Sequence, residues 1–451
     1  MVQQSDSDFP VLGKYINEYL KEKKNIILLH INHELDDIRD FHQILSPYFV
    51  RSIFITIPYK IESYDEGKLP AKDFYKIYKE DGKNKIFSGN EVVSETGENL
   101  QEQMEDMFYA VFRELAADLE NMKLLILEDG GYHYSAVETI KNKYKNFEHK
   151  ILACIEQTRN GLRAYKQYAM VGKIGYPVLT VARSKIKMNI ESCYVAQNAV
   201  ETIKSFLSLL NQKMLEKKVL LFGYGAIGRY VSKMLDYYGC CQYIYDWNLR
   251  ISQVAKNDGR NVLETVNKFT FADNMLLIGT TGNASFTQEM LEAYIDSEAD
   301  NIILASVSSK QTEFQVLLEN KKKYVEESRI LRIGDYILGM EYQFNNVYKR
   351  KKIKVLADGY PINFYGEESL PLEVIDLIYA EMIYLMKLSI NSSEVLENSL
   401  YILGENSEIF GDIETRIFKE WEKIENTIKK NAKLQFLLEQ HPEEQYLRNE
   451  M

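Results

Sequence analysis

The sequence lacks the features that mark secreted, membrane-spanning and metal-binding proteins. Its 451 residues include only 4 cysteines, which form no CxxC pair and no zinc-ligand spacing, so we expect reduced structural cysteines and no bound metal. No apolar run approaches the roughly 20 residues that cross a bilayer. Residues 1–10 are polar and lack the apolar core of a signal peptide. These absences predict a cytoplasmic protein that has no membrane partner.

Basic residues are also too few for a general nucleic-acid binder. The chain has 55 Lys and Arg against 66 Asp and Glu, which gives a formal net charge of −11. Phosphate binding along a nucleic acid needs a basic face, so we expect no nucleic-acid partner and relate the acidity to solubility. The length exceeds one ordinary hydrophobic core and predicts two or three domains.

Short apolar runs that alternate with helical patterns indicate an α/β fold. Such runs are typical of buried parallel strands, and their alternation with amphipathic stretches is typical of strand–helix–strand units. The predicted strands are residues 25–30, 52–57, 123–128, 150–155, 218–222, 242–246, 275–279 and 301–305. The predicted helices include residues 10–24, 101–122, 190–217 and 371–388, whereas 59–98 is expected to be irregular.

This order of elements predicts an α/β substrate-like domain with a Rossmann NAD-binding domain inserted after it. The substrate-like domain is expected to comprise residues 1–190 and 365–390, and the Rossmann domain residues 191–364. Residues 391–451 are highly charged and are expected to form a helical C-terminal extension.

A GxGxxG motif follows the apolar run 218–222 and precedes a helical pattern, which is the context that the Rossmann fingerprint requires. Gly223 permits the tight turn, Gly225 lets the backbone approach a pyrophosphate, and Gly228 lets helix and strand pack closely. Together with Ala226 and Ile227 they open the helix, whose first amides can hold phosphates. The motif predicts a bound dinucleotide; the alternative is a glycine turn with packing roles only.

Two further segments extend this predicted site. Asp246 ends the next predicted strand, about 20 residues on, where an acid binds the ribose hydroxyls and favours NAD over NADP. A second glycine turn ends the strand 275–279 and offers cofactor contacts through Thr280, Thr281, Gly282 and Asn283. NAD is therefore the predicted cofactor, although this second segment could also be an ordinary turn.

Seven segments occur in an order and spacing that resembles the S-adenosylhomocysteine hydrolase (adenosylhomocysteinase) family. They are LLHINHE (28–34), LEDGG (127–131), IEQTRNG (155–161), KMNIESCYVA (187–196), KVLLFGYGAIG (218–228), TTGN (280–283) and LADGYPINF (356–364). The resemblance implies a substrate domain and an NAD domain that close about a hinge, a homodimer or homotetramer, and a small nucleoside-like substrate. It also implies a reaction in which bound NAD oxidises the ribose 3′-hydroxyl, homocysteine is eliminated, water adds and the hydride returns.

The resemblance alone assigns the catalytic candidates. Lys187 matches a lysine that helps to deprotonate the 3′-hydroxyl, and Glu191 replaces its partner aspartate. A carboxylate and an ammonium four residues apart would share one face of an α-helix. His30 and Asp129 match residues that serve acid–base chemistry near the leaving thiol.

The resemblance also assigns binding residues. Glu34 matches an acid near the adenine amino group, Gln157 stands where the family has a substrate-binding glutamate, and Asn32 lies in the same motif as Glu34. For the cofactor, Asn363 matches an asparagine near the carboxamide, and Thr158 lies in the IEQTRNG segment. Four other positions depart from the family. The family has asparagine at the position of Ser192, cysteine at that of Ala196, and histidine at those of Ser308 and Leu370.

Each catalytic candidate also has a structural alternative. His30 could be a hydrogen-bonded core histidine, Asp129 a turn-forming residue, and the lysine–glutamate pair a surface ion pair. His33 and His42 are expected to be solvated helix residues.

The residues are compatible with more than one function. The first is an adenosylhomocysteinase-like hydrolase that acts on an adenosyl thioether or a related nucleoside. The alternative is a catalytically impaired paralogue that binds NAD and a nucleotide-like ligand as a regulatory or sensor protein. A 2-hydroxy-acid dehydrogenase is disfavoured, because such enzymes use a histidine in or beside the cofactor domain and none of the 6 histidines lies within 191–364.

Overall fold

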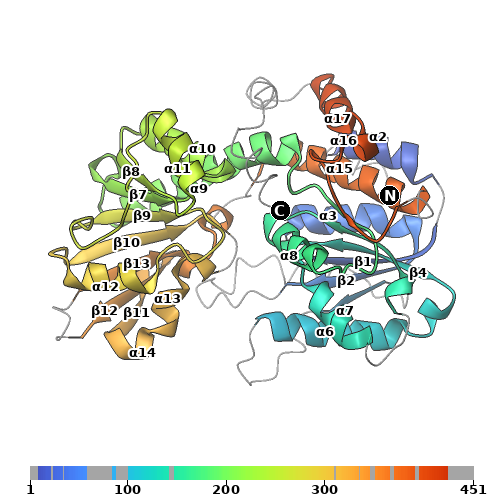
Figure 1. Cartoon of the computed structure of the whole chain (residues 1–451), viewed down its shortest axis with the longest axis horizontal. Coiled ribbons are helices and arrows are strands. Elements are labelled where there is room, and N and C mark those ends of the chain that lie inside the picture. Colours follow the sequence, from blue (N-terminus) through green and yellow to red (C-terminus); the bar gives the residue numbers. More distant parts are fainter. Residues whose placement is uncertain are drawn as a thin grey trace. The chain divides into compact units, whose positions relative to one another are not determined.

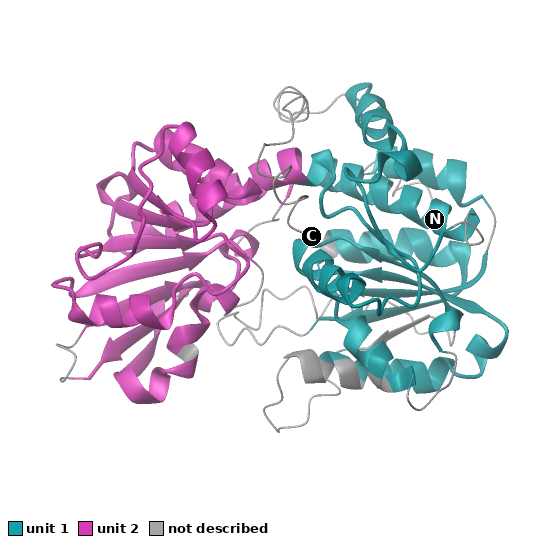
Figure 2. Ribbon diagram, viewed as in Figure 1, with its two compact units in different colours: residues 1–61, 68–187, 372–432 teal, residues 62–67, 188–371, 433–451 magenta. Residues whose placement is uncertain are grey.

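The computed structural model separates the chain into two compact units, which we describe in turn (Figures 1 and 2). Of the described residues, those up to 187 and from 372 onward form unit 1, and those from 188 to 371 form unit 2. The structure describes residues 9–21, 24–33, 35–57, 84–87, 100–141, 147–308, 311–334, 336–345, 351–365, 370–391 and 396–424. Among these residues, no helix has both the length and the apolar character needed to cross a bilayer.

Unit 1 is built on a seven-stranded sheet with the strand order β14-β6-β5-β4-β1-β2-β3, and every pairing between its strands is parallel. Its strands are β1 (Lys24–Asn32), β2 (Phe49–Thr56), β3 (Asn84–Phe87), β4 (Lys123–Glu128), β5 (Ile151–Glu156), β6 (Val178–Thr180) and β14 (Leu400–Ile402). Its helices are α2 (Pro10–Tyr19), α3 (Asp36–Leu45), α6 (Leu100–Leu115), α7 (His133–Lys141), α8 (Arg159–Met170), α15 (Leu372–Asn391), α16 (Ser407–Phe410) and α17 (Ile413–Glu422).

Both faces of this sheet are buried, which explains why its strands are continuous apolar runs. On one face Ile27, Leu29 and Ile31 of β1 pack into a core with residues of α6 and α7. The other face of β1 carries α3, where Phe41 stacks on Tyr379 of α15 with ring centroids 3.9 Å apart. The α/β class predicted from the alternating pattern is confirmed in this unit.

Two short strands of unit 1 correct the expectations for their segments. Leu400–Ile402 form β14, which pairs in parallel with β6, although this stretch was expected to be helical. Asn84–Phe87 form β3 beside β2, although 59–98 was expected to be irregular. Strands of three or four residues carry too little periodicity to be identified, and they form because a neighbouring sheet edge supplies hydrogen-bond partners.

Unit 2 is built on a second seven-stranded sheet, with the strand order β11-β12-β13-β10-β9-β7-β8. The strands β7 (Lys218–Phe222), β8 (Cys241–Tyr245), β9 (Met275–Gly279), β10 (Asn301–Ser306) and β13 (Lys352–Leu356) are parallel, and β11 (Val325–Ile333) and β12 (Tyr336–Phe344) add an antiparallel hairpin. Its helices include α9 (Ser192–Leu209), α10 (Ala226–Tyr237), α11 (Leu249–Asn257), α12 (Gln288–Asp296), α13 (Gln315–Glu319) and α14 (Lys321–Tyr324).

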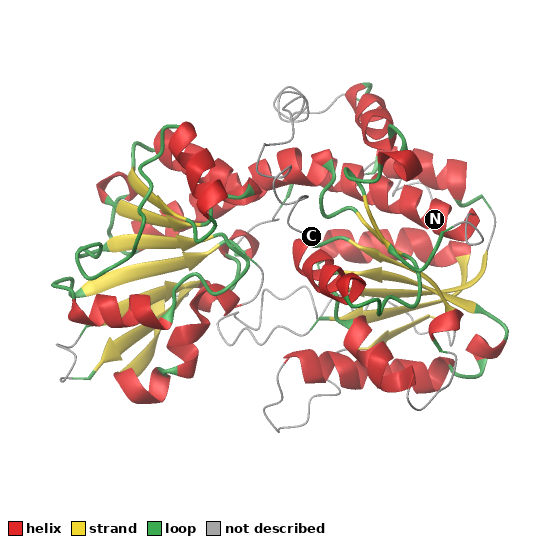
Figure 3. Cartoon of the chain, viewed as in Figure 1, coloured by secondary structure: helices red, strands yellow, loops and turns green. Residues whose placement is uncertain are grey.

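Helices lie on both faces of the second sheet (Figure 3). One core contains residues of α9 and α10, and the core on the opposite face contains residues of α12 and α13. This is the doubly wound architecture of a Rossmann domain, in which ligands bind at the carboxyl ends of the strands. The Rossmann class predicted for this part of the chain is confirmed.

The helix expected over 190–217 has a different form. A π-helical turn, Ile186–Glu191, leads into α9, which ends at Leu209. Asn211 follows with φ of 57°, a left-handed conformation that asparagine tolerates better than most residues and that stops the helix. The boundary between the two units falls within the π-helical turn, after Lys187.

Candidate functional site

The glycine turn of unit 2 has the geometry of a phosphate cradle. Gly223 has φ of 90°, which excludes most other residues. A side chain at Gly228 would place its Cβ only 2.3 Å from the carbonyl oxygen of Gly223. The helix α10 begins at Ala226, and Gly225 at its N-cap contributes no side-chain acceptor to the first amides. Those amides, which include that of Ile227, can therefore serve an anion.

Asp246 is held beside this turn. It follows β8, and its Oδ2 accepts a hydrogen bond from the backbone N–H of Tyr224 at 2.9 Å. Its Oδ1 accepts from the N–H of Asn248 at 2.9 Å. The carboxylate is thus joined to the middle of the glycine motif, at the position where an acid can bind ribose hydroxyls.

The second glycine turn rests against the first. The backbone N–H and the hydroxyl of Thr280 donate to the carbonyl of Phe222 at 2.9 and 2.8 Å. Thr281 and Gly282 instead donate to Glu313, at 2.9 and 2.7 Å, and Asn283 closes the turn. Thr280 therefore has a structural contact of its own, besides the cofactor contact predicted for it.

Two more residues belong to this edge of unit 2. Asn363 is buried, and the neighbouring Pro361 bridges to Ser306 at the end of β10. Glu313 was not identified from the sequence, because nothing in its local pattern distinguishes it from an exposed glutamate. Its side chain is fully buried.

A second cluster lies at the carboxyl ends of β1, β4 and β5 in unit 1. Gln157 donates from Nε2 to Oδ2 of Asp129 at 2.8 Å, so the structure brings these two predicted residues together. His33 joins them, with its Nε2 3.7 Å from Oδ1 of Asp129. The side chains of His33 and Asp129 are 12% and 17% exposed. A ligand at this edge could therefore reach both of them.

His33 and His42 correct the expectation that both are solvated helix residues. His33 follows the end of β1 and lies beside Asp129, where the convergence of parallel strands could have indicated it. His42 lies on α3 with its side chain fully buried. Burial lowers its pKa to about 3, so its ring is neutral.

His30 has the environment of a core histidine. It is fully buried, and its Nδ1 lies 3.3 Å from Nδ1 of His42. Its Nε2 lies 3.4 Å from Nδ2 of Asn32. Burial, and then the neighbouring His42, hold the pKa of His30 well below its usual value. The predicted role of Asn32 in substrate binding stays a prediction, and its Oδ1 accepts from the N–H of His33 at 2.8 Å.

Glu156 shapes the loops around Asp129 from beneath. Its carboxylate accepts hydrogen bonds from the N–H groups of Gly130 and Gly131 at 3.2 and 3.0 Å. It also accepts from the N–H and the hydroxyl of Thr158 at 2.6 and 2.7 Å. Burial raises the pKa of Glu156 well above its usual value. Thr158, predicted to contact the cofactor, lies in unit 1 and caps α8 through a hydrogen bond from Gly161.

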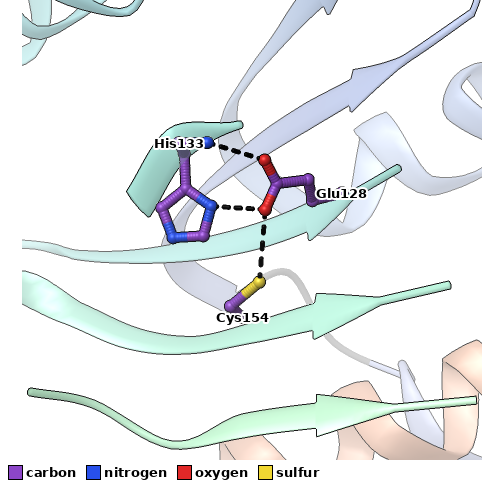
Figure 4. A group of neighbouring side chains, drawn as sticks. All are labelled: Glu128, His133 and Cys154. Carbon is purple, nitrogen blue, oxygen red and sulfur yellow. Dashed lines mark hydrogen bonds and ion pairs between the residues drawn. The ribbon is translucent and has the colours of Figure 1, made fainter. Parts of the chain in front are cut away.

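Glu128, His133 and Cys154 form a buried group close to this cluster (Figure 4). Glu128 accepts from Nδ1 of His133 at 2.5 Å and from its backbone N–H at 2.7 Å. The hydroxyl of Tyr165 donates to the same carboxylate at 2.8 Å, and Nε2 of His133 lies 2.7 Å from the hydroxyl of Tyr176. Although burial alone would raise the pKa of Glu128, the charge and hydrogen bonds of His133 lower it.

These three side chains are the candidate metal ligands among the described residues, but hydrogen bonds already satisfy them. Burial raises the pKa of the Cys154 thiol well above its usual value, which disfavours the thiolate that metals bind. We interpret the group as a network of hydrogen bonds and not as a metal site. The expectation of no bound metal stays a prediction.

The remaining predicted residues are less completely described. Lys187 donates its backbone N–H to the hydroxyl of Ser184 at 3.1 Å, and that hydroxyl donates to Glu381 at 2.8 Å. Glu191 ends the π-helical turn, so the spacing of an ordinary α-helix does not apply between Lys187 and Glu191. Glu34 lies outside the described residues.

No protein-family model matches the chain. In sequence it is similar to the S-inosyl-L-homocysteine hydrolase of Methanococcus maripaludis, 26% identical over 318 residues that cover 70% of this chain and 69% of that protein. It is also similar to the adenosylhomocysteinase of Archaeoglobus fulgidus, 23% identical over 283 residues that cover 62% of this chain and 64% of that protein. The chain thus spans about two thirds of the length of these relatives.

Among solved structures, the comparison finds a putative D-3-phosphoglycerate dehydrogenase from Ralstonia solanacearum with a TM-score of 0.41 at 12% identity, which covers 82% of this chain and 95% of that one. It also finds the D-lactate dehydrogenase of Aquifex aeolicus complexed with NAD and lactic acid, with a TM-score of 0.36 at 12% identity, which covers 76% of this chain and 96% of that one. Both of the sequence relatives named above are enzymes.

Proposed function

We propose that this protein is an NAD-dependent enzyme related to the S-adenosylhomocysteine hydrolases, with a nucleoside-like thioether as its substrate. The observation that carries the proposal is the glycine turn at Gly223, Gly225 and Gly228 with Asp246 fixed beside it. The close approach at Gly228 and the open first turn of α10 fit a diphosphate. The carboxylate of Asp246 fits unphosphorylated ribose hydroxyls and would repel a 2′-phosphate.

The residues of unit 1 support acid–base chemistry on a bound substrate. Gln157 holds one oxygen of Asp129 by a hydrogen bond, which leaves Oδ1 facing His33 at 3.7 Å. Asp129 and His33 together offer an acid–base pair for a leaving sulfur. Lys187 is proposed to take the hydroxyl proton of the ribose, and Glu191 lies on the same π-helical turn. Bound NAD supplies the hydride acceptor for the ribose.

The two similar relatives are named for S-inosyl- and S-adenosyl-homocysteine, which suggests the substrates to test. The experiment has two parts. Denatured protein is examined by mass spectrometry for released small molecules, and purified protein is titrated with NAD and NADP. The protein is then incubated with S-adenosylhomocysteine or S-inosylhomocysteine, and the thiol released is measured. We expect bound NAD, weaker binding of NADP, and thiol release with one of the thioethers; failure to bind NAD would overturn the proposal.

The alternative, a catalytically impaired paralogue that senses nucleotide-like ligands, is favoured by one observation. His30, a predicted acid–base residue, is fully buried and has a strongly lowered pKa. The variant Lys187→Ala separates the two functions. For an enzyme the substitution abolishes thiol release, whereas for a sensor it leaves ligand binding intact and there is no turnover to lose.

A further inference from the structure

Glu313 is a buried carboxylate that joins two loops of unit 2. It lies in a 3-10 turn, Gln311–Phe314, beyond the end of β10. From the loop after β9, the N–H of Gly282 and the hydroxyl of Thr281 donate to its carboxylate at 2.7 and 2.9 Å. From the segment after β10, the hydroxyl of Ser308 donates to it at 2.6 Å.

The backbone around Glu313 is adapted to this arrangement. Its carbonyl oxygen accepts from the N–H groups of Ser285 and Phe286, each at 3.1 Å. A Cβ on Gly279, the last residue of β9, would lie 2.7 Å from Oε2 of Glu313. Only glycine at that position leaves room for the carboxylate.

Burying a carboxylate that is bound only by neutral donors costs free energy, and that cost is high for a contact with a structural role alone. Burial raises the pKa of Glu313, while hydrogen bonds from Ser285, Ser308, Gly282 and Thr281 oppose that shift. A glutamine has one acceptor oxygen, so its NH2 group would have to donate to one of the hydroxyls that now donate to the carboxylate. The carboxylate therefore holds donors from two loops at one point.

The strand order shows which part of a dinucleotide these loops would meet. The strands β8, β7, β9 and β10 lie next to one another in that order, and Asp246 and the glycine turn occupy the carboxyl ends of β8 and β7. A dinucleotide whose adenosine ribose binds Asp246 and whose diphosphate binds the glycine turn must extend toward β9 and β10. Those are the strands whose loops Glu313 joins.

We propose that Glu313 is a positioning residue that fixes the loops after β9 and β10 against the nicotinamide half of the cofactor. This inference rests on the proposed binding of NAD. The carboxylate of Glu313 then contributes to the binding of NAD and not to the binding of ADP-ribose, which lacks the nicotinamide.

The test uses the full chain and the variant Glu313→Gln, titrated by calorimetry with NAD and with ADP-ribose. We expect the affinity for NAD to fall by about tenfold or more, because charge-assisted hydrogen bonds to the loops are lost, and the affinity for ADP-ribose to change by less than about twofold. The matched control is Glu319→Gln, an exposed glutamate of the same region that should leave both affinities unchanged.

The other outcomes are decisive as well. An unchanged NAD affinity in Glu313→Gln, or an equal loss for both ligands, overturns the inference while the proposed NAD binding stands. Wild-type protein that binds neither ligand overturns the proposed function and this inference with it. If Glu313→Gln does not fold, Ser308→Ala removes one donor and keeps the carboxylate, and it should reduce the affinity for NAD but not that for ADP-ribose.

Discussion

At the scale of single residues, three buried glutamates organise the candidate sites. Glu156 binds the loop that carries Asp129, and Glu313 binds the loops after β9 and β10. Glu128 is compensated by His133. A buried charge is tolerated only when hydrogen bonds or an opposite charge satisfy it, so each of these side chains is sensitive to substitution.

The first prediction concerns the glycine turn. Substitution Gly228→Ala places a methyl group 2.3 Å from the carbonyl oxygen of Gly223, so the turn must shift away from the phosphate position. We expect the affinity for NAD, measured by calorimetry, to fall by more than about tenfold. The control is Gly259→Ala, whose new Cβ meets no neighbour but whose φ of 76° is strained. It should lose about 1–2 kcal/mol of stability and keep its NAD affinity; equal NAD affinities in the two variants would contradict the prediction.

The second prediction concerns the buried network of Glu128. Glu128→Gln removes the charge that His133 and Tyr165 surround. We expect the free energy of unfolding, from urea denaturation, to fall by about 3–5 kcal/mol, as for other buried pairs that lose one partner. Glu138→Gln, which breaks a partly exposed pair with Lys141, is the control and should cost less than about 1 kcal/mol. Similar costs for both variants would show that the network has no special role.

At the scale of elements, α2 and α15 join the N-terminal and C-terminal segments of the chain that make up unit 1. Asp376 on α15 accepts hydrogen bonds from the N–H groups of Val11 and Leu12 at 3.0 and 2.7 Å. These groups belong to the first turn of α2, where a helix has unsatisfied donors and a positive dipole end. A residue 365 positions after Val11 in the sequence therefore caps this helix.

The third prediction is a pH dependence at this contact. Burial raises the pKa of Asp376 to about 7, against a usual value of 3.8, although the two N–H groups lower it. The folded protein keeps the proton over a range in which the unfolded chain releases it, so the contribution of Asp376 to stability falls as pH rises from about 4 to about 7. The total change is on the order of 4 kcal/mol at most.

The measurement compares wild type with Asp376→Asn, which cannot titrate. The difference in their free energies of unfolding should shift in favour of the variant between pH 4 and pH 7 and stay level above pH 8. A difference that does not change with pH would mean that folding does not raise the pKa of Asp376.

At the scale of the whole molecule, both units place their candidate residues at the carboxyl ends of parallel strands. In unit 1 these are Asp129, Gln157 and His33, and in unit 2 they are the glycine turn and Asp246. Parallel sheets bring the loops after successive strands to one edge, which is why residues distant in sequence can share a ligand.

The fourth prediction concerns the location of NAD binding within unit 2. Bound ligand stabilises the segments that it contacts, so amide hydrogen exchange should slow in those segments. With saturating NAD we expect protection in peptides that cover 222–229, 244–248 and 279–283, compared with 252–260, which should change little. The exchange is measured by mass spectrometry. If residues 222–229 gain no protection, the cofactor binds elsewhere.

Short-range patterns were enough to predict much of the framework. Apolar runs identified β1, β2, β4, β5, β7, β8, β9 and β10 to within a few residues, because buried parallel strands need continuous apolar side chains. The glycine motif was identifiable for a similar reason: each glycine answers a steric requirement set by its immediate neighbours. The strands β3, β6, β13 and β14 and the hairpin of β11 and β12 were missed, because pairing with a neighbouring strand decides them.

The candidate sites show the same division. Asp246 and the glycine turn could be found from spacing along the chain, whereas Glu313 could not. His33 and His42 were wrongly expected to be solvated, because only the position of β1 and α3 in the unit decides their burial.

The sequence by itself determined the α/β class, the Rossmann motif and the acid that follows its second strand, since these depend on interactions between residues close along the chain. The tertiary structure alone decided which polar side chains converge. Gln157 meets Asp129, and Thr281 and Ser308 meet Glu313. The physical reason is that burial and hydrogen bonding between distant segments depend on how the strands are ordered in each sheet, and no local pattern encodes that order.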